Sequence, residues 1–72
     1  MTWFAKRRRV RVHFLPSPGV ELADFEGVLA GKTGGHYLLL APRMLQDGGR
    51  SFTLEHAVEL PADRVWFMER LP

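Results

Sequence analysis

Three histidines are the side chains of this sequence best suited to binding a metal or moving a proton. His13, His36 and His56 are far apart, and no two of them have the close spacing that puts two ligands on one helix face. The sequence contains no cysteine, so thiolate ligands and thiol nucleophiles are excluded. A three-histidine metal site would need the fold to gather all three, and the simpler expectation is that each histidine faces solvent or a sheet edge.

Ser51 and His56 are the nearest approach to a nucleophile and its base. Such a pair needs an orienting acid or a strained turn that exposes the serine, and the surrounding residues signal neither. No pair of carboxylates for hydrolysis is identifiable, and 72 residues leave little room for an enclosed substrate pocket. We therefore expect a protein that is not an enzyme, with no cofactor, no metal and no small-molecule substrate.

A glycine-rich string, Gly31-Lys32-Thr33-Gly34-Gly35, contains the Gly-Lys-Thr of phosphate-binding loops. The earlier glycine of that motif is missing, and an apolar strand pattern follows where a phosphate loop opens a helix. The string predicts a tight hairpin turn.

Positive charge is concentrated near the N-terminus, although the formal net charge of the chain is only +2. The basic residues of this segment are Lys6, Arg7, Arg8, Arg9 and Arg11. From residue 12 onward the chain has five basic and eight acidic residues, a net charge of −3. The segment can bind nucleic acid, with Trp3 and Phe4 stacking on bases. It can also dock on an acidic neighbouring subunit, or it can be the solvated face of an edge strand.

The elements that position these side chains all read as strands. Apolar residues alternate with period two, and Gly or Pro interrupts them about every eight to twelve residues, which is typical of a small sandwich or barrel. Gly27 predicts a bulge or bend within its strand. A short helix over residues 41–46 is the main alternative, and Pro42 limits it. We expect strands at 9–14, 25–31, 36–41, 51–54, 58–60 and 65–71, with a helical turn at 61–63.

Two of the expected strands are apolar on both faces, at residues 37–40 and 65–68. A small barrel buries only the inward face of each strand. Either Trp66 and Met68, or else Val65 and Phe67, should therefore remain outside. We expect another subunit to cover this surplus, unless the N-terminal aromatic residues fold back over it.

The stretch Phe25-Glu26-Gly27-Val28-Leu29-Ala30-Gly31 resembles the bent second strand of SH3-like and Sm-like barrels, and Leu60-Pro61-Ala62-Asp63-Arg64-Val65 is similar to the helical turn before the last SH3 strand. The layout of residues 35–37 and 64–68 also looks like that of small virion proteins of tailed phages. The Asp and Asn of the Sm pore and the tyrosine-rich stretch of SH3 domains have no counterpart, since Pro42 to Leu45 carry neither acid nor amide.

These observations predict an all-β chain, a small five- to six-stranded SH3-like or Sm-like barrel (residues 9–72) with a basic N-terminal arm (residues 1–8). The resemblance implies a structural module that docks onto other subunits as a phage capsid decoration or head-tail connector protein, in a virion if phage-derived and otherwise in the cytoplasm. The alternative is an Sm-like nucleic-acid-binding barrel. No membrane partner is expected, since no apolar run could span a bilayer. The expected apolar anchors are Trp3, Phe4, Tyr37, Trp66 and Met68, with the five basic residues making polar contacts.

Overall fold

A computed structural model describes residues 3–19 and 23–72, and for residues 3–5 the backbone alone. This part of the chain is all-β, with one short 3-10 turn. Its elements are β1 (Trp3–Phe14), β2 (Asp24–Thr33), β3 (His36–Leu45), β4 (Ser51–Thr53), β5 (Val58–Pro61), η1 (Ala62–Arg64) and β6 (Val65–Arg70). None of the described residues belongs to a helix long and apolar enough to cross a membrane.

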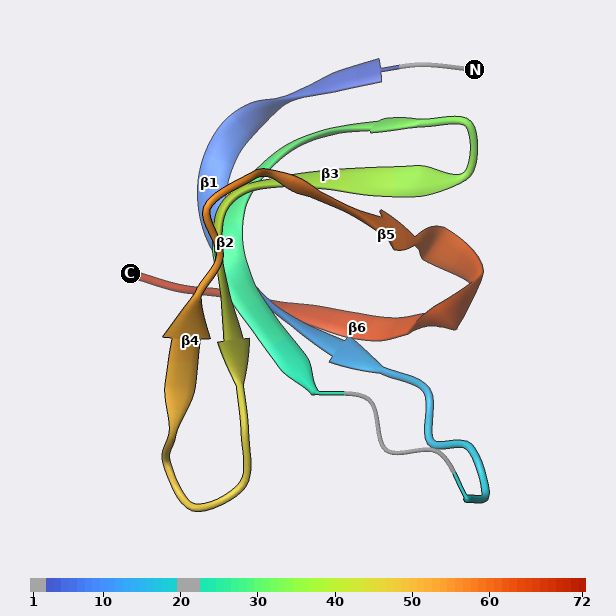
Figure 1. Cartoon of the computed structure of the whole chain (residues 1–72). Coiled ribbons are helices and arrows are strands. Elements are labelled where there is room, and N and C mark those ends of the chain that lie inside the picture. The colour runs from blue at the N-terminus through green and yellow to red at the C-terminus, as the bar shows by residue number, and fades with distance from the viewer. Residues whose placement is uncertain (1–2, 20–22) are drawn as a thin grey trace.

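The strands form one antiparallel sheet in the order β4-β3-β2-β1-β6, and β5 pairs with β3 beside β4. The first half of β3 pairs with β5, and its second half pairs with β4. Figure 1 shows that β1, β2 and β3 curve strongly, so that β5 and β6 face each other across the interior. The strands at the ends of the described sheet, β4 and β6, do not pair, so the sheet is bent but not closed by hydrogen bonds.

The bends in β2 and β3 coincide with irregular pairing. Glu26 faces Arg43 and Val28 faces Leu40, so β3 carries one more residue than β2 across this interval. Ala41 lies there with a φ of 47°, in the left-handed region that non-glycine residues rarely adopt. The irregularity expected at Gly27 is therefore present at this point of the sheet, but the extra residue belongs to β3, which faces Gly27. It redirects β3 from β5 towards β4.

The turn between β2 and β3 follows from its two glycines. Gly34 and Gly35 have φ angles of 55° and 77°, which is the backbone of the two-residue hairpin turn that matches strand twist. The tight turn expected from the Gly-Lys-Thr-Gly-Gly string is confirmed. It leads from one strand into another, whereas a phosphate-binding loop leads into a helix.

The core consists of aliphatic side chains from four strands. Val10 and Val12 of β1, which alternation assigns to the inner face, pack with Leu29, Leu39 and Leu60. Val12 and Leu39 have no exposed surface. The opposite face of β1 therefore carries Arg9, Arg11 and His13, as expected from the sequence.

Two boundaries differ from the sequence expectation. β1 begins at Trp3, so Lys6 to Arg8 belong to a strand that the sequence pattern places only from residue 9. Residues 41–45 of the candidate helix (41–46) continue β3 instead, because pairing with β4 satisfies backbone groups of Arg43 to Leu45. Pro42 is buried there, and its carbonyl accepts a hydrogen bond from the Leu54 amide at 2.9 Å.

Candidate functional site

Charged side chains form a row across four strands on the face of the sheet opposite the core. Arg43 of β3 faces Glu26 of β2, Glu26 faces Arg11 of β1, and Arg11 faces Glu69 of β6. The charges alternate in sign along this row, which we call the polar ladder. Oppositely charged cross-strand neighbours stabilise a sheet. The polar ladder therefore fixes the register of four strands at one level.

Glu26 is the centre of the polar ladder, and its side chain is only 11% exposed. Arg11 donates to one carboxylate oxygen from Nε, at 3.0 Å, and from its terminal NH2 group. Arg43 lies 3.8 Å from the other oxygen. The hydrogen bonds from Arg11 hold the pKa of the Glu26 carboxyl below its usual range, in opposition to burial, which raises it. The same hydrogen bonds raise the pKa of Arg11. Both groups are thus kept charged.

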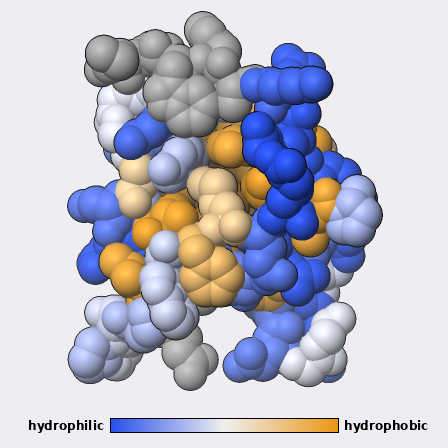
Figure 2. Space-filling view, turned by 180° about the vertical axis from the view of Figure 1, so that it is seen from behind, coloured by the Kyte–Doolittle hydropathy of each residue, from blue (hydrophilic) through white to orange (hydrophobic). Residues whose placement is uncertain are grey.

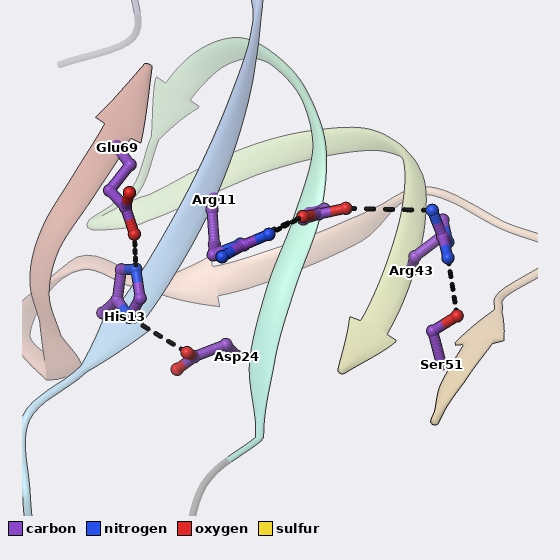
Figure 3. A network of polar contacts seen from close by, with 7 residues as sticks. Arg11, His13, Asp24, Arg43, Ser51 and Glu69 are labelled. Carbon is purple, nitrogen blue, oxygen red and sulfur yellow. Dashed lines mark hydrogen bonds and ion pairs between the residues drawn. The ribbon is translucent and has the colours of Figure 1, made fainter. Parts of the chain in front are cut away.

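His13 joins three strands beside the polar ladder. Its Nδ1 lies 2.9 Å from an Asp24 oxygen and its Nε2 lies 2.5 Å from a Glu69 oxygen, and the ring stacks on Phe67 with centroids 4.3 Å apart. Figure 3 shows the imidazole between the two carboxylates. We call this group the His13 clasp.

Neither group has the form of a metal or catalytic site. The two carboxylates of the His13 clasp approach opposite nitrogens, so the three side chains cannot converge on one ion. The described residues contain no group of three His, Asp or Glu side chains suited to a metal. Ser51 accepts a hydrogen bond from Arg43 at 2.6 Å, so its hydroxyl contacts one end of the polar ladder. Within the described part, no buried side-chain polar atom lacks a partner.

An open depression of about 590 Å³ lies beside the β2–β3 turn, between that turn and η1. Lys32, His36 and Asp63 contribute its polar side chains. The Lys32 ammonium lies 5.4 Å from the centre of the Tyr37 ring, and His36 Nδ1 donates to the Gly34 carbonyl at 3.0 Å. The depression thus carries mixed charge, and two of its polar groups have partners within the chain.

The basic residues of the N-terminal segment do not behave as one group. Lys6, Arg7, Arg8 and Arg9 are exposed on β1. Arg11 is paired with Glu26, and its side chain is still 39% exposed. Of the five basic residues, four are exposed and Arg11 forms an ion pair within the chain.

The largest exposed aromatic side chain of the described residues is Trp66 of β6, at 59%. Phe67, its neighbour in sequence, is 43% exposed, and the two rings meet edge to face with centroids 5.1 Å apart. β6 pairs only with β1 among the described strands, so these aromatics lie on a sheet edge. We call Trp66 and Phe67 together the aromatic edge.

A bulge explains why consecutive residues of β6 are both exposed. Val65 faces Phe14 and Phe67 faces His13, so Trp66 is an extra residue without a facing partner on β1. Val65 and Met68 consequently both pack against the core. Both expected combinations, Trp66 with Met68 outside or Val65 with Phe67 outside, were wrong, because each assumed unbroken alternation. Phe67 was missed as an anchor for this reason.

The other expected anchors have different surroundings. Tyr37 and Met68 are partly buried and pack against the core cluster, so most of their apolar surface is already covered. The side chains of Trp3 and Phe4 lie outside the described residues. Of the predicted anchors, Trp66 is the one that the structure presents to solvent. Figure 2 shows, on one face, hydrophobic residues reaching the surface beside a band of hydrophilic ones.

The chain matches no known family model, no curated protein sequence and no solved structure. Any function assigned to the chain therefore rests on the geometry of the polar ladder, the basic residues of β1 and the aromatic edge.

Proposed function

We propose that this protein is a non-catalytic assembly module that docks onto other protein subunits through the aromatic edge of β6. The observation that carries the proposal is the exposure of Trp66 at 59% beside Phe67 at 43% on an edge strand. Aromatic side chains dominate the binding energy of protein interfaces, and burying one of this size contributes about 1.5–3 kcal/mol.

The polar groups of the protein support a structural role over a catalytic one. In the polar ladder each named charge faces an opposite charge within the chain, and in the His13 clasp both ring nitrogens contact carboxylates. Catalytic side chains need donor or acceptor atoms that are available to a substrate. A sheet whose charges satisfy one another is instead a stiff platform, which keeps the aromatic edge in a fixed position for a partner.

The strand arrangement favours an SH3-like or Sm-like barrel within this proposal. β1 pairs with both β2 and β6, and the 3-10 turn η1 connects β5 to β6, as the resemblance of Leu60 to Val65 implies. Small barrels of this kind serve as connectors and capsid decorations in tailed phages, and we propose a virion assembly as the setting. If the chain is not of phage origin, we propose the cytoplasm. A shared fold does not establish a function, so the proposal rests mainly on the exposure of the aromatic edge.

Trp66→Ser tests the docking surface. We expect the wild-type chain to associate as its concentration rises and Trp66→Ser to weaken that association about tenfold or more, measured by sedimentation velocity. Phe52→Ser is the matched control, because Phe52 is an exposed aromatic (46%) on β4, at the other end of the sheet. A wild-type chain that stays soluble and monomeric up to millimolar concentration would contradict the proposal.

A second candidate function is nucleic-acid binding, and the exposure of Lys6, Arg7, Arg8 and Arg9 on one strand favours it. Clustered cations bind the phosphate backbone with little sequence preference. The rest of the chain carries net negative charge, which favours β1 as the contact surface.

A further inference from the structure

The N-terminal part of β1 is an unpaired edge of the sheet. β6 pairs with β1 only from Val10 to Phe14, and the Leu71 amide donates to the Arg9 carbonyl at 3.0 Å. Before this point, residues 3–8 have β2 on one side and no described strand on the other. Figure 1 shows this part of β1 at the rim of the bent sheet. We call residues 3–8 the free edge of β1.

The free edge of β1 is also incompletely paired with β2. In its centre, β1 has residues 5–7 where β2 has only Ala30, so β1 bulges here. The extra residues of a bulge have no ladder partner. Lys6 and Arg7 are exposed within this stretch. Their backbone N–H and C=O groups are therefore open to a partner from outside the chain.

Uncompensated positive charge lies along the free edge of β1. Within the described residues, the exposed side chains of Lys6 to Arg9 form no hydrogen bond or ion pair. The fold adds Arg70, an exposed residue that faces Val10 at the end of β6 and has no ion-pair partner among the described residues. Backbone groups without a partner and cations without a counter-charge thus coincide at one sheet edge.

We propose that the free edge of β1 binds an extended acidic segment of a partner protein as an added strand. The backbone of the segment pairs with residues 3–8, and its carboxylates lie beside the cations of β1 and Arg70. This surface is separate from the aromatic edge, and the proposal does not depend on docking through Trp66 and Phe67.

Charge selects an acidic occupant for this edge. A second copy of β1 would bring two rows of cations side by side, and like charges on neighbouring strands destabilise their pairing. A neutral strand would gain the backbone hydrogen bonds alone. An acidic strand gains these bonds together with charge-assisted contacts, so it is the occupant that the edge favours most.

Backbone chemistry favours a polypeptide over a nucleic acid at the same place. N–H donors and C=O acceptors alternate along a strand edge, and another strand supplies a partner for both kinds of group. The phosphate backbone of a nucleic acid supplies acceptors only, so the carbonyl groups of the free edge gain nothing from it. The net charge of −3 after residue 11 also repels a long polyanion more strongly than a short acidic segment.

A pair of peptides tests strand addition on the intact chain. The first is a fluorescein-labelled Ser-Glu-Val-Glu-Val-Glu-Val-Glu-Ser peptide with both ends blocked, and the second is the same peptide with every backbone amide N-methylated. The second peptide keeps every charge but has no backbone N–H donor. Fluorescence anisotropy at low salt should show binding of the first peptide and affinity lower on the order of tenfold for the second.

A matched pair of charge variants locates the site. Arg70→Gln should weaken binding of the first peptide by about two- to fivefold, the usual effect of one exposed ion pair. Arg50→Gln removes the same charge from an exposed position immediately before β4 and should bind as the wild type does. Circular dichroism checks that both variants are folded.

Amide hydrogen exchange, followed by NMR, reports on the backbone directly. At saturating concentration the first peptide should slow exchange within residues 3–8 on the order of tenfold, because amides of the free edge become hydrogen-bonded. The N-methylated peptide still offers carbonyl acceptors, so equal occupancy of the two peptides is not assumed. Exchange is therefore compared with that of the free protein.

Three results would overturn the proposal. Equal affinity for the two peptides would show that charge alone attracts them, and unchanged exchange within residues 3–8 would show that no strand is added. Binding of single-stranded oligo-thymidine without binding of the first peptide would assign the edge to nucleic acid. Weaker binding after N-methylation, slowed exchange at the free edge and an effect of Arg70→Gln but not of Arg50→Gln together support it. Self-association through the aromatic edge is measured separately by sedimentation, so either proposal can fail alone.

Discussion

Glu26 lies on the face of the sheet opposite the core, where solvent contact is the usual condition of a carboxylate. Arg11 and Arg43 approach it from the two neighbouring strands and reduce the exposure of its side chain to 11%. A carboxylate with so little water needs these donors to remain charged. Glu26 therefore links β1, β2 and β3 through its contacts with Arg11 and Arg43.

Replacing Glu26 by Gln should destabilise the fold by about 1–2 kcal/mol at neutral pH, because the charge-assisted hydrogen bonds from Arg11 are weakened. The pKa of Glu26 is lowered in the folded state, mainly by these hydrogen bonds. A lowered folded-state pKa contributes stability above the unfolded-state pKa, and this contribution is lost as the pH falls through the folded-state pKa. The free energy of unfolding of the wild type should therefore fall on acidification.

Urea unfolding from neutral pH down to about pH 3 measures this effect, and the stability of Glu26→Gln should vary less with pH than that of the wild type. Glu59→Gln is the matched control, since Glu59 is an exposed residue of β5. Equal pH dependence in the wild type and Glu26→Gln would show that the polar ladder is not what stabilises the register.

The strands β2 and β3 approach each other closely at Gly27. A Cβ atom at this position would lie 2.7 Å from the Leu40 carbonyl oxygen and 2.8 Å from Cγ of Leu39. Leu39 is fully buried, and the carbonyl belongs to the backbone, so neither neighbour can move without disturbing the core. Gly27→Ala should therefore cost about 1–3 kcal/mol, the usual penalty for overpacking.

Thermal or urea unfolding of Gly27→Ala checks this expectation, with Gly48→Asn as the control. A Cβ at Gly48 meets nothing within 4 Å, and Asn tolerates the positive φ of 84° there. A Gly27→Ala protein as stable as the wild type would mean that β2 and β3 can separate at this bend without loss of packing.

Viewed as a whole, the molecule separates its charges. Four exposed cations lie on β1 at residues 6–9, and the sequence after residue 11 carries a net charge of −3. Arg11 belongs to the basic cluster in sequence but to the polar ladder in space. Within the basic cluster, the four exposed cations are therefore the main candidates for phosphate contacts.

If the chain binds duplex nucleic acid through this cluster, log affinity against log salt should have a slope of about −3.6, since each phosphate contact contributes about −0.9. Replacing Arg7, Arg8 and Arg9 together by Gln should flatten the slope to about −0.9, whereas Arg50→Gln should leave it unchanged. Fluorescence anisotropy at several salt concentrations measures the slope. Unchanged affinity of the triple variant would exclude the basic cluster as a nucleic-acid site.

The sequence by itself determined the strands and turns. Alternation placed Val10 and Val12 in the core, Gly34-Gly35 predicted the hairpin turn, and the residues before Val65 predicted the helical turn. These features depend on neighbours within a few residues, so a local pattern is enough to specify them. Trp66 was named as an apolar anchor and is exposed, but neither expected combination placed it outside together with Phe67.

Only the tertiary structure decided which strands meet and in what register. Arg11 looked like one of five equivalent cations until β2 brought Glu26 beside it, 15 residues away in sequence. Phe67 looked like an alternative to Trp66 until the pairing of β6 with β1 inserted a bulge between Val65 and Phe67. A single extra residue reverses the facing of all that follow, and its position depends on how two distant strands fit together. That information is not contained in either strand alone.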